Sequence, residues 1–388
     1  MTDRVLDLPR RQPIVLGQQA GLVVILVLLG ALFTSKSPGF LSSFNLFVLG
    51  RSLAIDIVIG FSQMVVLATG GMNLSVGSIG VCVVMMGGYL MQVVGLSVPI
   101  ACALALVLGG ALGWLNGFTI ARSGVNSFIV TLASANLFSG AMLILTKATP
   151  LNALPRSVAA FGQMRIGGGW VSPMLAMAVA IGVALIIFYR YSVIGRQSLA
   201  TGANQRAAEM SGVPVGRRVI AAHALSGVLA GVAGLLTAAR VGAAMPAVGG
   251  QDWLLPSFLG PVLGGAALAG GFVSVGGTML GAALVTTIRS GLLVMGVGNF
   301  WLDLFLGLFL LAAVLLQRIA ALCRRAPGCM GPELCAASSM PSGRACWRRS
   351  WSARSSLPSS RRISCRNSIS TCCCAASASA SSLPSRRW

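Results

Sequence analysis

Two polar strings in an otherwise apolar chain are the places where this protein could do chemistry. The first string, ATGGMNLSVGSIG, occupies residues 68–80. Its small and polar residues interrupt a helical pattern, and non-helical backbone at membrane depth is tolerated only where protein or a water-filled cavity satisfies it. Two interpretations stay open: a broken helix that lines a solute path, or a simple turn between two spans. The candidate path residues are Gly70, Gly71, Asn73, Ser75 and Gly77.

The second string is a long polar segment that covers residues 189–218. It contains a short helix-forming core, Gln205 to Met210, with Gly202 before it and Gly212 after it. Glycines of this kind mark the ends of helices and the start of turns. A short helix parallel to the membrane would suit the docking of a soluble partner, and a plain connector is the alternative.

The residue types argue against catalysis by this chain. A phosphate-binding Walker A loop needs Gly-x-x-x-x-Gly-Lys-Ser/Thr, whereas the only lysines, Lys36 and Lys147, stand in other contexts. The single histidine, His223, is more typical of a packed residue than of a ligand. No cluster of His, Cys and acidic residues precedes residue 323, so we expect no enzyme activity, no cofactor and no metal.

One acidic residue, Asp56, lies well inside an apolar run. Ionisable residues at membrane depth are functional candidates, and a proton-coupled carrier would show such an acid. An ion-coupled secondary carrier is therefore the alternative function. Other charged residues lie near the ends of apolar runs, where snorkelling to the interface is expected; they are Arg51, Arg240, Asp252, Arg289 and Asp303.

The composition requires elements that hold these strings inside a membrane. Of 388 residues, 56% are hydrophobic and 9% are charged, whereas a soluble domain carries about 25% charged residues. Apolar runs of about 20 residues can each cross the hydrocarbon layer. We therefore predict an all-α, polytopic transmembrane helical bundle of about eight to ten spans with broken helices. The runs cover about 14–33, 46–69, 76–95, 98–121, 127–146, 171–189, 219–239, 254–270, 276–295 and 300–318.

The charge distribution predicts location and orientation. The net charge is +21, but the basic residues of the apolar part gather in loops, as the positive-inside rule describes. This pattern predicts cytoplasmic N- and C-termini, with residues 1–13 as a cytoplasmic segment, and argues against nucleic-acid binding. We expect residues 14–322 to form the transmembrane domain, with a cytoplasmic loop at about 190–218.

The last part of the chain has a different composition. Residues 323–388 hold 11 arginines, one glutamate and eight of the ten cysteines, without a periodic apolar face. Such a segment cannot bury enough apolar surface to fold, so we predict a disordered tail. A shifted reading frame of a GC-rich gene would produce this Arg/Ser/Cys-rich composition.

Five strings in register resemble one family. They are GGMNLSVGSIG (70–80), NSFIVTLASANLFSGAMLILT (126–146), GRQSLATGANQRAAEMSGVPV (195–215), ALSGVLAGVAGLLTAARVGAAMP (224–246) and VLGGAALAGGFVSVGGTMLGA (262–282). Over roughly residues 15–320 the chain resembles the permease subunits of bacterial ABC importers for ribose, xylose, arabinose and related sugars. The resemblance implies a multi-pass protein of the bacterial inner membrane that forms the path for a monosaccharide-like solute.

The resemblance also implies partners and roles. Such permeases work as a homo- or heterodimer in the lipid bilayer, with separate ATP-binding subunits and a periplasmic sugar-binding protein. By position, the residues that resemble the ATPase-coupling loop are Gly202, Asn204, Ala208, Ser211 and Gly212. Two departures leave the sugar open: Asn73 stands where the family has an acid, and residues 253–265 read WLLPSFLGPVLGG where many members carry an acidic stretch.

Overall fold

The computed structural model describes residues 12–37, 39–165, 172–246 and 251–296, with a few residues between 301 and 311. The described segments form twelve α-helices and a short 3-10 helix, and a single antiparallel bridge joins Leu151 to Ala244. The elements are α1 (Gln12–Lys36), α2 (Ser43–Ala68), α3 (Val76–Gln92), α4 (Val98–Ser123), α5 (Ser127–Thr146), α6 (Arg156–Gln163), α7 (Pro173–Tyr191), α8 (Val193–Ala203), α9 (Gln205–Met210), α10 (Val215–Val241), η1 (Gln251–Trp253), α11 (Leu254–Leu263) and α12 (Val275–Val294).

The helices confirm the predicted polytopic bundle. Seven described helices are long and apolar enough to cross a membrane: α1, α2, α4, α5, α7, α10 and α12. The predicted span at 76–95 is the 17-residue α3. The prediction of a span over 254–270 is wrong in length, since α11 has 10 residues, or ~15 Å at 1.5 Å per residue. The predicted tail, and nearly all of the predicted span at 300–318, lie outside the described residues.

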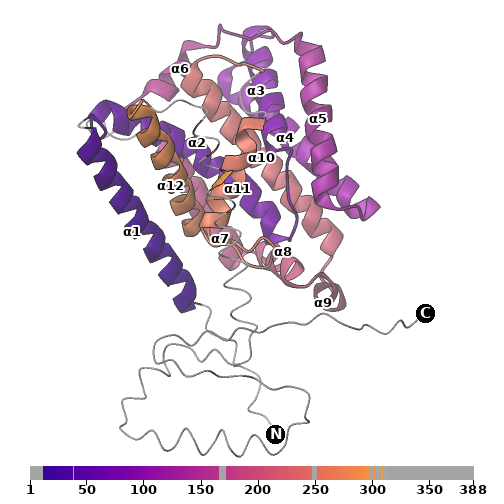
Figure 1. Ribbon diagram of the computed structural model, residues 1–388. Helices are drawn as coiled ribbons and strands as arrows, with labels where there is room; N and C mark the ends of the chain where they lie inside the picture. The colour runs from indigo at the N-terminus through magenta and orange to yellow at the C-terminus, as the bar shows by residue number, and fades with distance from the viewer. Residues whose placement is uncertain are drawn as a thin grey trace, which may run out of the picture. The chain divides into compact units, whose positions relative to one another are not determined.

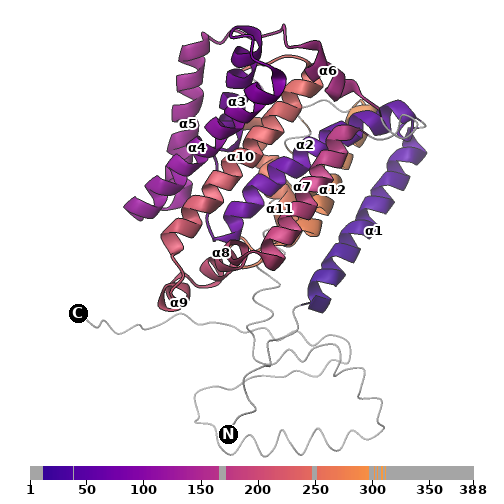
Figure 2. The ribbon, with the colours of Figure 1, turned by 180° about the vertical axis from the view of Figure 1, so that it is seen from behind.

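Helix α2 is the centre of the bundle. It packs against α7, α10, α11 and α12, and the run from Ala54 to Ala68 is buried throughout. The ribbons show α2 between α10 and α12 from both sides (Figures 1 and 2). Because the first polar string begins at the end of α2, that string also lies deep among the helices.

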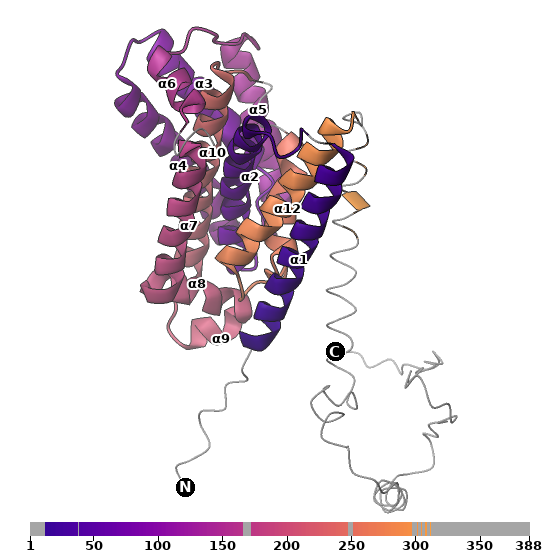
Figure 3. The ribbon, with the colours of Figure 1, turned by 90° about the vertical axis from the view of Figure 1, so that its left-hand side faces the viewer.

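Glycines spaced four apart allow close helix contacts. On α4, Gly109, Gly113 and Gly117 lie against the backbone of α10. A Cβ atom on Gly109 would lie 2.8 Å from the carbonyl oxygen of Gly227, which no real side chain tolerates. Small residues of this kind let membrane helices approach backbone to backbone. A helix at the edge, α1, instead packs along α12 through larger side chains such as Leu22 and Ile288 (Figure 3).

The polar segment 189–218 contains two helices. The predicted helix Gln205–Met210 is confirmed as α9. Helix α8 was not predicted, because its sequence VIGRQSLATGA has no apolar stripe that would indicate a helix. Ser192 caps α8 and Asn204 caps α9, each by accepting a hydrogen bond from a backbone N–H of the first turn.

Candidate functional site

The first polar string forms a buried link between α2 and α3. Helix α2 ends at Ala68 and α3 begins at Val76, so residues 69–75 leave the helical ladder. Side chains of α5 satisfy the freed backbone: the N–H of Met72 donates to Ser127 Oγ at 3.0 Å, and the N–H of Leu74 donates to Thr131 Oγ1 at 3.1 Å. Non-helical backbone at this depth is therefore satisfied by protein, as a membrane interior demands.

Asn73 is the hub of a buried polar network inside this link. Its side chain has no exposed surface. Its Nδ2 donates to Ser226 Oγ at 2.9 Å, and its Oδ1 accepts from the hydroxyl of Ser75 at 2.7 Å. Asn116 Nδ2 donates to the same Ser75 hydroxyl at 2.8 Å, and the hydroxyls of Ser62 and Ser226 lie 2.9 Å apart. The network joins α2, α4 and α10 through neutral groups only.

The two polar strings meet at a junction of backbone atoms. Gly70 has a φ of +81°, a left-handed conformation that favours glycine. Gly202, at the end of α8, lies against the Ala68 carbonyl, and a Cβ atom on it would lie 2.5 Å from the backbone nitrogen of Gly271. The N–H of Gly271 donates to the carbonyl of Ala68 at 3.3 Å. We call these residues, Ala68, Gly70, Gly202, Gly270 and Gly271, the glycine junction.

The remaining candidates lie on either side of this junction. Gly71 packs close to Ser127 and to the ring of His223, and Gly77 is buried on α3. On α9 only Ala208 is buried. Ser211 is exposed, and its hydroxyl donates to a carbonyl one turn back. Gly212 has a φ of +78° with open space around its Cα. The structure therefore brings Gly70 and Gly202 together and leaves the α9 residues at the surface.

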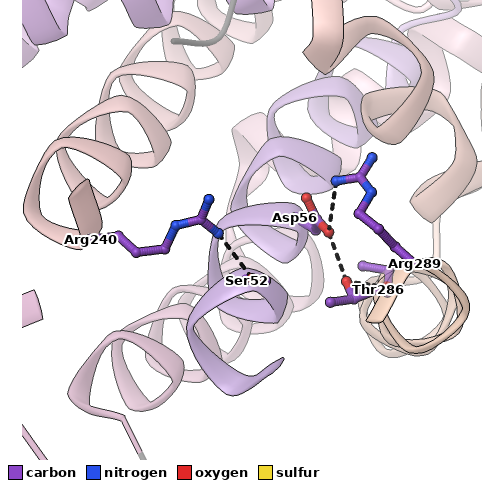
Figure 4. A network of polar contacts seen from close by, with 6 residues as sticks. Ser52, Asp56, Arg240, Thr286 and Arg289 are labelled. Carbon is purple, nitrogen blue, oxygen red and sulfur yellow. Dashed lines mark hydrogen bonds and ion pairs between the residues drawn. The ribbon is translucent and has the colours of Figure 1, made fainter. Parts of the chain in front are cut away.

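A cluster of charged side chains, which the sequence left unconnected, surrounds the first half of α2 (Figure 4). Thr286 Oγ1 donates to Asp56 Oδ2 at 2.7 Å, and Arg289 Nη1 lies 4.0 Å from the same oxygen. On the opposite side of α2, Arg240 Nη1 donates to Ser52 Oγ at 2.9 Å. Both arginines, which the sequence places near span ends, point at α2: Arg240 ties it to α10 and Arg289 ties it to α12.

Two further polar side chains are fully buried on the central helices. His223 has no exposed surface, and its Nδ1 lies 3.0 Å from the carbonyl of Val219, so the interpretation as a packed residue is confirmed. Gln63 on α2 is equally buried, and neither atom of its amide has a partner among the described residues. Gln63 was not among the predicted candidates, although it is the lone amide in the apolar run GFSQMVVLA.

A cavity of about 390 Å³ lies away from these groups. It opens between α3, α4, α6 and α10, and apolar side chains such as Val84, Leu106, Phe161 and Leu235 line it. A solute with many hydroxyl groups would lose its hydrogen bonds there without replacement. The cavity is therefore no candidate for the solute path.

Comparison with known proteins identifies the family. The family model described as branched-chain amino acid transport system / permease component matches residues 40–314. The ribose import permease protein of Escherichia coli (strain K12) is 31% identical over 77% of this chain and 93% of its own length. That of Bacillus subtilis (strain 168) is 32% identical over 78% of this chain and 92% of its own.

A third relative is named for a different solute. The autoinducer 2 import system permease protein of Photorhabdus luminescens is 32% identical over 76% of this chain and 87% of its own length. No solved structure matches the chain. These matches confirm the predicted resemblance to importer permeases. The chain therefore belongs to this family of transport-system permease components, and it is a multi-pass protein of the bacterial inner membrane.

Proposed function

We propose that this importer permease carries a monosaccharide-like solute, which a periplasmic binding protein delivers and ATP hydrolysis in separate subunits drives. The relatives named for ribose and autoinducer 2 support a sugar-like solute over the amino acids in the family description. The polar groups around the first string also favour it. Asn73, Ser75 and Asn116 offer neutral amide and hydroxyl groups, which suit hydroxyl groups rather than a charged amino acid.

The glycine junction is the observation that supports the proposed coupling between α8 and the solute path. Backbone atoms of α8 lie directly against the start of the first polar string. A shift of α8 must therefore move Gly70 or Gly271, because no flexible side chain lies between them to absorb it. We place the solute path along residues 70–77. The path is closed in this conformation, since Asn73 and Ser75 have no exposed surface.

Helix α9 is the proposed docking site for the ATPase subunits. Only Ala208 of this helix is buried, and Met210 is 84% exposed. An exposed, flexible apolar side chain of this kind is frequent at binding surfaces. In this proposal α9 faces the cytoplasm, the side to which the charge pattern of the sequence assigns both chain termini.

Transport by the reconstituted importer tests the function. Proteoliposomes that contain this chain, its ATPase subunits and its binding protein should take up labelled ribose or a related sugar only with internal ATP. Labelled leucine should not be transported. The chain alone should show no uptake when a proton or sodium gradient is imposed. Gradient-driven uptake by the chain alone would establish the secondary carrier instead.

A matched pair of glycine variants tests the docking assignment. Gly212→Val should uncouple ATP hydrolysis from transport, because a valine at a φ of +78° distorts the end of α9. Gly124→Val is the control, since Gly124 has a φ of +68° and equally open surroundings after α4. Equal loss of coupling in both variants would contradict a special role for α9. Labelling of Ser211→Cys from the outside of intact cells would contradict the orientation.

A further inference from the structure

The apolar cavity between α3, α4, α6 and α10 extends from one end of the bundle into its membrane-spanning part. Its wall on α4 begins at Val98, the first residue of that helix, and reaches Leu106, a length of about 12 Å at 1.5 Å per residue. Ser157 and Phe161 line it on α6, which lies at the opposite end of the bundle from α9 (Figures 1 and 2). Because α4 and α10 are both long enough to cross a membrane, the cavity begins near one membrane surface and continues toward the hydrocarbon.

The walls of this cavity suit a hydrocarbon chain. Apart from the hydroxyl of Ser157 and the thiol of Cys102, the lining side chains are aliphatic, thioether or aromatic. Water finds too few hydrogen-bond partners in such a space, and apolar cavities stay dry but take up apolar molecules. The volume of about 390 Å³ lies within the range of roughly 300–1,000 Å³ that is typical of ligand-binding pockets.

The surroundings of the cavity make a membrane lipid the apolar molecule at hand. On α4, Leu104 and Val107 flank the lining residue Leu106, and they are 46% and 68% exposed. Phe161 on α6 is 38% exposed, and Leu235 on α10 is half-buried. The apolar surface of the spans therefore continues into the cavity, and a lipid chain can enter it from the side.

A cationic side chain stands beside the end of the cavity near the membrane surface. Arg156 is the first residue of α6, directly before the lining residue Ser157, and it is exposed. Within the described part of the chain the one ion pair joins Asp56 and Arg289, so Arg156 has no acidic partner there. Arginine forms strong, charge-assisted hydrogen bonds with phosphate groups, and basic residues near a membrane surface attract anionic lipids.

We propose that the cavity binds one acyl chain of an anionic phospholipid, whose phosphate group lies beside Arg156 and Ser157. The chain lies along α4 and α10 and fills the space that α6 covers. The phosphate neutralises the arginine, and the hydroxyl of Ser157 donates a hydrogen bond to it. The proposed orientation of α9 assigns this lipid to the outer leaflet. Binding itself depends neither on that orientation nor on the transported solute.

Native mass spectrometry of the full chain tests the lipid site. The protein is reconstituted in vesicles with equal amounts of phosphatidylglycerol, which is anionic, and phosphatidylethanolamine, which carries no net charge. After brief extraction into detergent, we expect the parent chain to retain phosphatidylglycerol several-fold more often than phosphatidylethanolamine. The assay needs no ATPase subunit and no transport, so its result is independent of the proposed function.

Two matched pairs of variants locate the acyl chain and the phosphate. Cys102→Trp fills the cavity and should lower lipid retention several-fold, whereas Leu104→Trp places the same side chain on the exposed face of α4 and should not. Arg156→Gln should abolish the preference for phosphatidylglycerol, whereas Lys147→Gln removes an exposed cation after α5 and should not. Equal retention by the two tryptophan variants would overturn the site. An equal preference in the two glutamine variants would overturn the role of Arg156.

Photolabelling of the parent chain tests the site without any substitution. Phosphatidylglycerol with a photoreactive diazirine in one acyl chain should label Leu106, Phe161 or Leu235, and unlabelled phosphatidylglycerol should compete. Ile144 and Leu145 on α5 are 79% and 78% exposed and report ordinary lipid contact, which the same competitor should reduce much less. Labelling that is as strong and as weakly competed at these two residues as in the cavity would overturn the proposal. Labelling of α5 alone would also overturn it, because the cavity would then be closed to lipid.

Discussion

The contact between Asp56 and Arg289 allows a quantitative prediction about stability. Asp56→Asn preserves the size of the side chain and an oxygen that can accept the Thr286 hydroxyl, but it removes the charge opposite Arg289. Arg289→Leu removes the other partner and leaves a buried carboxylate with one hydrogen bond. The two single variants and the double variant form a thermodynamic cycle that isolates the energy of the pair.

The distance between the two charged groups sets the expected coupling energy. Arg289 Nη1 and Asp56 Oδ2 are 4.0 Å apart, and Coulomb's law with an effective dielectric constant near 20 gives about 4 kcal/mol at that distance. The side chain of Arg289 is 33% exposed, so screening reduces this attraction, and we expect a coupling energy of about 2 kcal/mol. Arg289→Leu should lower the free energy of unfolding by about 3–5 kcal/mol, because it leaves the buried charge unpaired. Asp56→Asn should lower it by less.

Reversible unfolding in detergent micelles measures these energies. The double variant should be more stable than the sum of the single effects predicts, by the coupling energy. Asp252→Asn is the control, since Asp252 is an exposed acid outside the cluster. A coupling energy near zero, or an Asp252→Asn effect as large as that of Asp56→Asn, would refute the argument that the pair holds α2 to α12.

Two further predictions concern the proposed path. Gly202→Val should lower stability by about 3 kcal/mol or more and abolish transport, because its side chain must displace backbone at the glycine junction. Transport assays and the melting temperature measure these two effects. Gly216→Ala should behave like the parent protein, because the nearest neighbour of the added Cβ atom would lie 3.7 Å away. Asn73→Leu should cost about 2–4 kcal/mol in unfolding free energy, since it leaves the hydroxyls of Ser75 and Ser226 without their partner. Asn73→Asp should cost less, because aspartate keeps an oxygen that accepts from the Ser75 hydroxyl, and its second oxygen can accept from Ser226 once that hydroxyl turns to donate.

Much of the fold could be predicted because membranes impose simple patterns. A span needs about 20 apolar residues, so the long helices stand out in the sequence. The limits of α9 could also be predicted, since helix-ending residues are local signals. Helix α8 was missed because a surface helix without an apolar stripe has no such signal.

The charged cluster could not be predicted from local patterns. Asp56 and Arg289 lie on different helices far apart in sequence. Asp56 alone resembles an isolated acid inside a span, and Arg289 alone resembles a residue near a span end. Only the packing of α2 between α10 and α12 turns these charges into a pair. The contact between Gly70 and Gly202 could not be predicted for the same reason, since it also depends on how distant segments pack. Sequence marked both glycines as candidates, but nothing in their spacing indicated that they touch.

The middle of α2 and its C-terminal end are held in different ways, and this difference bears on how the importer moves. Near Asp56 the helix is held by long side chains, and Arg289 can rotate while it remains close to the carboxylate. At Gly70 it is held by backbone atoms in direct contact with α8, which have no rotamers to adjust. We therefore expect a displacement of α8 to move the end of α2 and the first polar string, whereas the middle of α2 around Asp56 has more freedom to adjust. For this reason, variants at Gly202 should alter the coupling of ATP hydrolysis to transport, and variants at Asp56 should alter stability first.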